Sequence, residues 1–272
     1  MRTIAPALAA LSLLTTSAQA EAPAGRVAPG GIVRWPGVEL VSCELDGRRW
    51  EPFEGACWYP VDLGRKGEIE LVRRSSGGVA SRRVAVGDYP YPEQRLEVDD
   101  KYVAPPADQL ARIEREKKAV AALFRIETPR RFELPLAPPL DPLPDPGRFG
   151  ARRVFNGEPR SPHSGSDFRA TTGTPVRAVA PGRVMLADDH YFAGKSVYVD
   201  HGDGLISMSF HLSEILVHEG QEVRAGEVLG KVGATGRVTG PHLHFGFRWH
   251  GARVDPGLLL GAGATAGRIE IR

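Results

Sequence analysis

The chain has 272 residues, of which 35 are basic and 33 acidic, so its formal net charge is only +2. This length is enough for one large or two ordinary domains with a buried core. So small a net charge argues against a nucleic acid as the partner.

Residues 1–20 have the pattern of an export signal. Arg2 supplies a positive charge, residues 4–14 form a short apolar run, and Ala18-Gln19-Ala20 resembles a cleavage site. The run is too short to span a bilayer. We therefore expect the mature chain to begin at Glu21, without a transmembrane anchor, in the periplasm or outside the cell.

Export makes the two cysteines informative. Cys43 and Cys57 are the only cysteines of the chain. An oxidising compartment would join them in a disulfide, whereas the alternative is a pair of buried free thiols. We predict the disulfide.

Residues 21–104 have short β-type runs separated by turn signals. Asp46-Gly47 is a hairpin dipeptide, and residues 75–78 separate two further runs in the same way. The pattern predicts a small N-terminal β-sandwich-like module. This region contains no histidine, so it cannot supply an imidazole to a metal site.

Residues 105–147 predict a helix followed by a linker. Apolar residues recur at helical spacing between Asp108 and Phe124, and Asp108 is placed to cap the helix. Seven prolines then follow between Pro129 and Pro146, which is typical of a stiff, extended segment. We expect a domain boundary there.

Residues 148–262 are rich in β-type runs and glycine, and residues 263–272 read as a C-terminal tail. Two strand–turn–strand units, at residues 174–184 and 219–230, resemble the half-barrels of biotinyl and lipoyl carrier domains. The Met-Lys-Met tip of a carrier is missing, and the histidines would have no task in one. We therefore predict an antiparallel β catalytic domain with a duplicated, hybrid-motif-like architecture, in a chain that is mainly β.

The histidines of this region alternate with apolar residues. In the predicted strand at residues 241–247, Leu243 and Phe245 fall on one face, and His242 and His244 fall on the other. In a second strand, residues 205–211, the same rule places Phe210 with the core and His211 opposite. We expect all three histidines to be displayed away from the core.

Three side chains could supply ligands to a metal. His163-Ser-Gly-Ser-Asp167 and His244 offer two imidazoles and one carboxylate, which leaves a fourth position for water, as in a catalytic zinc site. Pro162 and Gly165 place the first two ligands on a loop. Of the other histidines, we expect His201 to be structural and the rest to face solvent: His190, His218 and His250.

The segment from Phe149 to Pro256 resembles the LytM/lysostaphin-type zinc metallopeptidases, which cleave peptide bridges in bacterial peptidoglycan. The motifs that carry the resemblance are Phe149-Gly-Ala-Arg152, His163-x-x-x-Asp167, Asp200-His-Gly202, His211-Leu-Ser213 and Gly-x-Thr-Gly leading into His242-x-His244. The resemblance implies that His163, Asp167 and His244 bind one zinc ion. It also implies that His211 and His242 are the catalytic pair.

One position departs from the family pattern. The family usually has a tyrosine two residues before the histidine at His211, and this chain has Ser209. Where such a tyrosine helps to hold a developing oxyanion, a serine would not reach as far. We expect this difference to bear on turnover or on the preferred bridge, and not on zinc binding.

The function that these observations predict is hydrolysis of peptide cross-links in peptidoglycan. We expect a monomeric D,D-endopeptidase that acts on D-alanyl–diaminopimelate bonds, with peptide stems as its partner and no nucleic acid. Two alternatives remain open. One is a catalytically weak relative that binds the wall and activates an amidase, and the other is a peptidase that acts on glycine-rich proteins.

Overall fold

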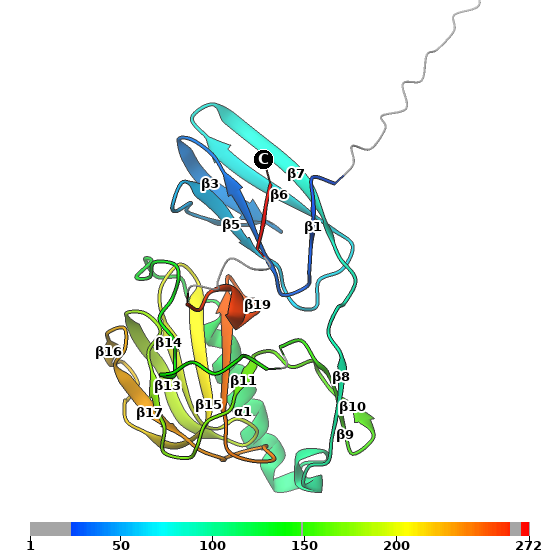
Figure 1. The fold of residues 1–272 in the computed structure, drawn as a ribbon, viewed down its shortest axis with the longest axis vertical. Helices are drawn as coiled ribbons and strands as arrows, with labels where there is room; N and C mark the ends of the chain where they lie inside the picture. The colour runs from blue at the N-terminus through cyan, green and yellow to red at the C-terminus, as the bar shows by residue number, and fades with distance from the viewer. Residues whose placement is uncertain (1–22, 148, 262–267, 272) are drawn as a thin grey trace, which may run out of the picture.

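The computed structural model describes residues 23–147, 149–261 and 268–271 (Figure 1). The chain is mainly β, as predicted, with a single α-helix in the described part. The export signal predicted at residues 1–20 lies outside the described residues. Within the described ranges, no helix has the length and apolar character needed to cross a membrane.

The N-terminal module contains two packed sheets. One has the strand order β1-β7-β6-β3-β4, and the other has the order β20-β2-β5. The strands are β1 (Arg26–Val27), β2 (Ile32–Pro36), β3 (Leu40–Leu45), β4 (Arg48–Trp50), β5 (Ala56–Pro60), β6 (Glu68–Ser75), β7 (Gly78–Val86) and β20 (Arg268–Glu270). Both predicted hairpins are present, because β3 pairs with β4 and β6 pairs with β7.

A disulfide joins Cys43 of β3 to Cys57 of β5, so it connects the two sheets of this module. Both cysteines are fully buried beside the aromatic residues Trp35 and Tyr59. The Tyr59 hydroxyl donates a hydrogen bond of 2.7 Å to the Val72 carbonyl. The one polar atom of this ring is therefore satisfied within the apolar core.

The C-terminal segment is not a tail. Residues 268–270 form β20, which pairs in parallel with β2, and Ile271 is buried in the same core (Figure 1, red among blue). Ile269 and Ile271 alternate with Arg268 and Glu270, which is the pattern of a half-buried strand. The run is too short for sequence pattern alone to distinguish it from a tail.

The segment that leaves the N-terminal module also departs from the predicted boundary. Residues 93–96 form β8 (Glu93–Leu96), which pairs in parallel with β9 (Arg152–Phe155), and β9 pairs with β10 (Glu158–Pro159). This region was predicted to belong to the N-terminal module. Its hydrogen-bonding partners instead lie after the proline-rich segment.

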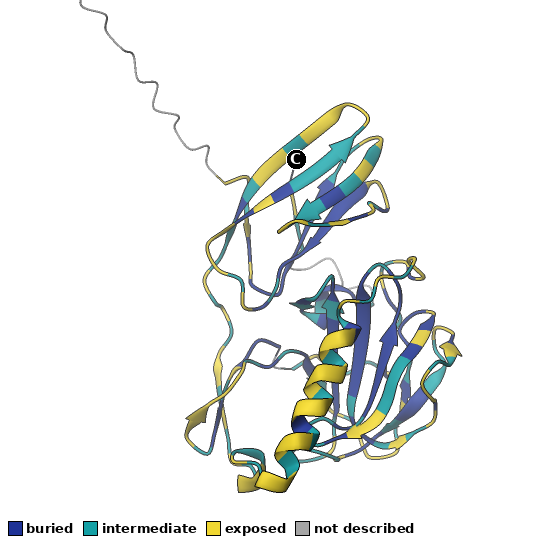
Figure 2. Ribbon diagram, turned by 180° about the vertical axis from the view of Figure 1, so that it is seen from behind, coloured by how far each residue is buried: buried dark blue, intermediate teal, exposed yellow. Residues whose placement is uncertain are grey.

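A short 3₁₀ turn, η1 (Asp100–Tyr102), leads into helix α1 (Ala107–Leu123). The helix begins one residue before the predicted start, after Pro106, and Asp108 lies in its first turn and does not cap it. One side packs on the peptidase sheet, where Leu123 contacts Tyr198, Ile206 and Met208. Figure 2 shows that the outward side of the helix is exposed.

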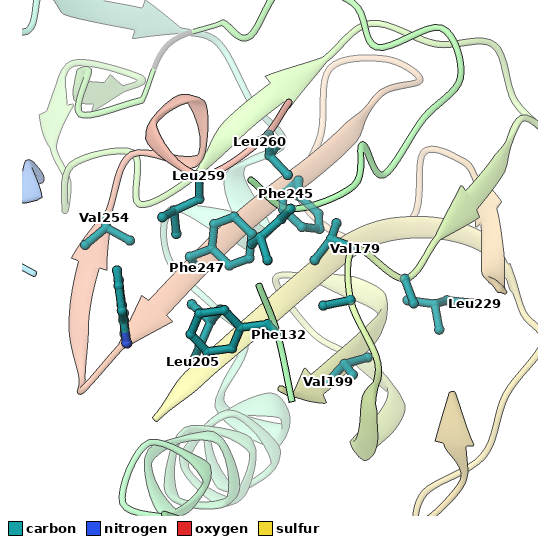
Figure 3. Packing of buried hydrophobic residues seen from close by; sticks show 14 of the residues in the cluster. Phe132, Val179, Val199, Leu205, Leu229, Phe245, Phe247, Val254, Leu259 and Leu260 are labelled. Carbon is teal, nitrogen blue, oxygen red and sulfur yellow. The ribbon is translucent and has the colours of Figure 1, made fainter. Parts of the chain in front are cut away.

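The proline-rich segment does not separate two bodies. Phe132, Leu136 and Leu140 are almost fully buried, and they belong to the main core of the peptidase region. Prolines lack the N–H that a strand would use, so the segment makes few ladder hydrogen bonds. Its apolar side chains nevertheless give it a place in the core, as Phe132 shows in Figure 3.

The peptidase region is built on a nine-stranded sheet. The main path runs β11-β18-β15-β14-β13-β16, with β17 paired to β15 and β12, and β19 paired to β18. The strands are β11 (Ser166–Phe168), β12 (Pro175–Arg177), β13 (Gly182–His190), β14 (Gly194–Asp200), β15 (Leu205–Ile215), β16 (Glu222–Val223), β17 (Val228–Val232), β18 (Leu243–Trp249) and β19 (Ala252–Val254), followed by η2 (Pro256–Leu258).

The two regions share a contact. Phe53 and Trp58 of the N-terminal module are in the same apolar cluster as Trp249 of β18. Beside this cluster, Arg253 donates two hydrogen bonds to the Asp62 carboxylate, at 2.6 and 2.9 Å. The core around Phe245 and Phe247 continues beneath β18 (Figure 3). This contact holds β18, the strand that carries His244, in place.

Candidate metal centre and active-site groove

Three ligand atoms converge at one end of the peptidase sheet. His163 Nε2 lies 2.8 Å from His244 Nδ1, and each of these nitrogens lies 3.0 Å from Asp167 Oδ1. Asp167 of β11 and His244 of β18 are register partners in adjacent antiparallel strands. The ladder between these strands therefore brings together two residues that are 77 positions apart.

The protonation states suit a cation. Burial lowers the pKa of His163 to about 4, and burial also lowers the pKa of His244. Burial alone would raise the pKa of Asp167, but the hydrogen bonds from His163 and His244 hold it well below its ordinary range. At neutral pH the cluster offers two neutral imidazoles and one carboxylate, which is the form that binds a metal.

A glycine allows the loop to pass over this cluster. A Cβ atom on Gly165 would lie 2.7 Å from His244 Nε2 and 2.5 Å from the Phe245 carbonyl oxygen. Neither contact can be relieved easily, because one involves backbone and the other a candidate ligand. The glycine between His163 and Asp167 therefore lets both reach His244. The donor set, its burial and this close approach all fit a single bound divalent metal.

Two further histidines flank the cluster. His211 Nδ1 donates a hydrogen bond of 2.9 Å to the Thr235 carbonyl, and His242 Nδ1 donates one of 2.9 Å to the Gly240 carbonyl. A carbonyl accepts only, so each neutral ring carries its proton on Nδ1 and has a free electron pair on Nε2. His242 Nε2 lies 3.5 Å from Asp167 Oδ1, and the two rings are 5.0 Å apart.

His211 is held in its neutral form. Burial, followed by the neighbouring imidazoles of His244 and His242, lowers its pKa well below the ordinary value. A neutral imidazole can accept a proton, so both histidines can serve in acid–base chemistry. The geometry does not assign the role of proton acceptor to His211 rather than His242, or the reverse.

The strand that carries His211 does not follow the predicted alternation. In β18, Leu243 and Phe245 face the core while His244 faces away, as expected. In β15, however, Phe210 is the register partner of His244 and stacks on it at 5.2 Å, so Phe210 lies on the site face. Phe210 does pack against an apolar cluster with Tyr198 and Met208, but the prediction that it lies on the face opposite the histidines was wrong.

A β-bulge places His211 beside His242 and His244. Between the pairs Val197–Ser209 and Lys195–Leu212, β15 advances three residues while β14 advances two. His211 has φ of 64°, in the left-handed region that side chains other than glycine rarely adopt. The extra residue turns its ring toward His242. Such strain at a candidate active site is consistent with a functional constraint.

The same register corrects the expectation for Ser209. Ser209 pairs with Phe245, whose ring lies in the main core, so it faces away from His244. Its hydroxyl is buried and has no hydrogen-bond partner among the residues that the structure describes. A side chain at this position therefore points away from the candidate reaction centre. The serine has no bearing there on how an oxyanion is held.

Thr235 is a positioning residue that the sequence did not single out. Its carbonyl accepts the His211 hydrogen bond, and its hydroxyl donates to the Leu212 carbonyl at 2.8 Å and accepts from the Lys195 N–H at 3.0 Å. These bonds hold the Gly-x-Thr-Gly run against the bulge. A threonine between glycines, just before the histidines, was the available signal.

The remaining histidines divide differently from the prediction. His201 is structural as expected, since its ring nitrogens bond the Pro181 carbonyl and the Ser207 hydroxyl. His218 is exposed, but His190 is buried and only 5% of the His250 side chain is exposed, so neither of these two faces solvent. His250 stacks on Trp50 at 4.2 Å, a partner from the N-terminal module that no local sequence pattern could reveal.

The cluster of candidate metal ligands opens into a groove of about 730 Å³. One wall comes from β8 and β9, which contribute Gln94 and Phe155, and the other comes from the loop before β18 and the turn at Phe192. His211, His242 and His244 line the same groove. An extended chain can therefore reach the cluster and both flanking histidines at once.

Comparisons with known proteins identify the family of this region. Residues 161–256 match peptidase family M23. Peptidoglycan DD-endopeptidase ShyA of Vibrio cholerae is 46% identical over 98 residues, which are 36% of this chain and 23% of that protein. DD-carboxypeptidase/endopeptidase Mpg of Neisseria meningitidis is 45% identical over 94 residues, 35% of this chain and 22% of that protein.

These matches span less than a third of the curated relatives' length. A longer match is the crystal structure of a Pseudomonas aeruginosa protein assigned to peptidase M23. It is 36% identical, has a TM-score of 0.66, and is aligned over 87% of this chain and 95% of that one. The alignment extends well beyond the peptidase motifs, and the family resemblance seen in the sequence is confirmed. The chain belongs to the M23 family of metallopeptidases.

Proposed function

We propose that this protein is a zinc-dependent endopeptidase that hydrolyses the D-alanyl–diaminopimelate cross-links of peptidoglycan. The observation that carries the proposal is the triangle of His163, Asp167 and His244 at the floor of a groove, with the basic nitrogens of two more histidines beside it. The names of the relatives, as peptidoglycan DD-endopeptidases, support the substrate.

In this proposal His163, Asp167 and His244 hold the zinc ion. When bound, zinc supplies a Lewis acid that polarises a carbonyl and lowers the pKa of water towards ~7. The protein's part is to keep the two imidazoles neutral and the carboxylate charged, as the pKa directions indicate. Arg153, 3.6 Å from Asp167, adds a positive charge behind the carboxylate.

His211 and His242 would move the protons. Each has Nδ1 tied to a backbone carbonyl, so each presents Nε2 as the acceptor. A ring that takes the proton from the attacking water becomes charged and can then pass that proton on to the leaving amine. A ring that becomes charged would also stabilise negative charge developing on the cleaved carbonyl.

We further propose that the protein acts in the periplasm as a monomer. The leader-like residues 1–20 and the disulfide between Cys43 and Cys57 support export to an oxidising compartment. The alternative of a catalytically weak amidase activator has less support. All five candidate residues are present: Asp167, His211, His242 and His244 line one groove, and His163 is buried beside Asp167 and His244.

The test is digestion of purified peptidoglycan by the mature protein, with and without a chelator, followed by mass spectrometry of the new ends. We expect cross-linked dimers to become monomers by cleavage after D-alanine, and the chelator to stop the reaction. The His242→Ala protein is the matched control for contaminating hydrolases. Intact dimers alongside cleavage of pentaglycine would contradict the substrate and leave the metal mechanism in place.

A further inference from the structure

Arg237 lies on the loop between β17 and β18 and lines the same groove as the metal cluster. Its guanidinium sits between two aromatic rings, 4.7 Å from the centre of Phe155 and 4.8 Å from the centre of Phe192. Its backbone N–H also donates a hydrogen bond of 2.9 Å to the Phe192 carbonyl. The side chain is therefore held by two aromatic contacts and, at its base, by a backbone hydrogen bond.

Among the residues that the structure describes, no hydrogen bond or ion pair to this guanidinium is found. Its charged neighbours are Arg153 and Arg160, and burial followed by these two charges lowers the pKa of Arg237 to about 10. The group thus remains charged at neutral pH. A partly buried cation without a counter-charge is costly, and aromatic faces compensate only in part.

The position of this cation relative to the metal cluster follows from a chain of contacts. Arg153 lies 3.6 Å from Asp167, and its guanidinium also lies 5.8 Å from the centre of the Phe155 ring. Arg237 lies against the same ring. Along one wall of the groove, Phe155 therefore lies between Arg153, which pairs with Asp167, and Arg237, whose guanidinium has no ion pair within the described part of the chain.

We propose that Arg237 binds a free carboxylate of the peptide substrate. The planar guanidinium fork fits a carboxylate in a bidentate arrangement, and the two rings fix the plane of that fork in advance. Because Arg237 lines the groove and its aromatic neighbours offer no hydrogen-bond acceptor, its N–H groups are available to an anion bound there. This inference rests on the proposed function and refines its substrate class.

The proposed cross-link carries a suitable group. In a D-alanyl–diaminopimelate bond, the carbon that bears the scissile nitrogen also bears a free carboxylate. A glycine bridge has no such group, and an amidated diaminopimelate presents a neutral amide in its place. The carboxyl terminus of a peptide stem is a second source of the same chemistry. Arg237 would thus favour unamidated, acidic wall peptides.

The experiment measures binding to the zinc-loaded protein by titration calorimetry. The probes are stem tetrapeptides with a free diaminopimelate carboxylate, with that carboxylate amidated, or with only the chain-end carboxylate amidated. The proteins are the wild type, Arg237→Gln, Arg237→Lys and Arg224→Gln. Arg224 is exposed and outside the groove lining, so its variant controls for the loss of one positive charge.

We expect the wild type to bind one amidated probe about 10- to 100-fold more weakly than the free acid, as the loss of a charge-assisted pair predicts. Which amidation has this effect identifies the source of the carboxylate. Arg237→Gln should bind all three probes equally, Arg237→Lys should keep part of the preference, and Arg224→Gln should behave as the wild type. Zinc content should be unchanged throughout.

Two results would overturn the proposal. The wild type would bind the three probes equally, or Arg237→Gln would keep the preference for the free acid. In either case Arg237 would only brace Phe155 and Phe192. Cleavage of matched dimers is recorded in parallel. If no dimer is cut but the binding preference depends on Arg237, the proposed function fails and the carboxylate site stands.

Discussion

The N-terminal module and the peptidase region are both built from packed β-sheets, but they bury different chemistry. Among the described residues, the polar or charged ones that are buried as whole residues all lie in the peptidase region: His163, Ser166, His190, Ser196, Asp200, His201, Ser207, Ser209, His211 and His244. The N-terminal module buries apolar and aromatic residues and a disulfide. Burying polar groups costs stability unless each is paired.

The difference separates two kinds of residue. In the peptidase region, hydrogen bonds and the candidate metal site explain why histidines are buried, which packing alone would not. In the N-terminal module, the core is filled by side chains whose role is to stabilise the fold. Substitutions of the site residues in the first region should therefore change chemistry, whereas substitutions in the second region, or near the contact between the two, should change the free energy of unfolding. The predictions below test that division.

The largest effect is expected for Asp167→Ala. Removing the only carboxylate of the cluster takes away its negative charge, so the protein should lose both its metal and its hydrolytic activity. Elemental analysis and a muropeptide assay measure the two losses. Asp188→Ala, at an exposed position of the same region, is the control and should retain both. Full metal occupancy in Asp167→Ala would contradict the ligand assignment.

The next largest effect is expected for His211→Ala and His242→Ala. Each should keep the metal but lose about two to four orders of magnitude in kcat, which is the usual contribution of acid–base catalysis. His218→Ala, at an exposed site, should be as active as the wild type. If either variant lost its metal together with its activity, that histidine would be a ligand and the roles would have to be reassigned.

Within the N-terminal module, replacing Cys43 and Cys57 together by serine should lower the free energy of unfolding by about 3 kcal/mol, as expected for a loop of about 15 residues. The kcat of the folded protein should not change. Urea unfolding and a kinetic assay measure the two quantities. Two free thiols titrating in denatured, unreduced wild-type protein would show that the bond does not form in the cell.

The smallest effect concerns Asp203, which lies near the contact between the regions, 3.5 Å from the His250 ring. Burial raises the pKa of Asp203 to about 7. Between its unfolded value near 4 and about 7, the folded state binds the extra proton, so this carboxyl's contribution to stability falls as pH rises through that window. Above it, the folded protein holds a poorly paired buried charge.

Asp203→Asn should therefore stabilise the protein by about 2 kcal/mol at pH 8 and hardly at all at pH 4. Asparagine also tolerates the residue's φ of 51°. His250 has a pKa lowered to about 3 by burial, and it titrates in the opposite sense, but it is present in both proteins and so cancels in the comparison. Denaturation at both pH values measures the difference. An equal gain at both would refute the titration.

Sequence pattern correctly predicted the faces of Leu243, His244 and Phe245 in β18, because that strand alternates without interruption. It failed on β15, where a single extra residue at His211 reverses the faces that alternation assigns. A bulge depends on the neighbouring strand and on the Thr235 loop, which is long-range information. The metal ligands could be proposed from spacing and family resemblance, because those residues are defined by their chemistry.

The misplaced elements share one cause. β20, β8 and the proline-rich segment all take their structure from partners far away in the chain. Local composition described the proline-rich segment as an extended spacer, and it is extended. Only the tertiary fold shows that Phe132 and Leu136 fill the peptidase core. Arg237 was missed for the same reason, since its aromatic neighbours come from two other segments.

The return of β20 to the N-terminal module has a consequence for proteolysis. The two regions are connected in sequence after β7, and they are connected again in space by the pairing of β20 with β2. One cut in the first connection would leave two fragments held together, because Ile271 stays in the core of the module and the Arg253–Asp62 pair is untouched. Release of the N-terminal fragment would need β20 to detach as well, so a single cut would not separate the two regions.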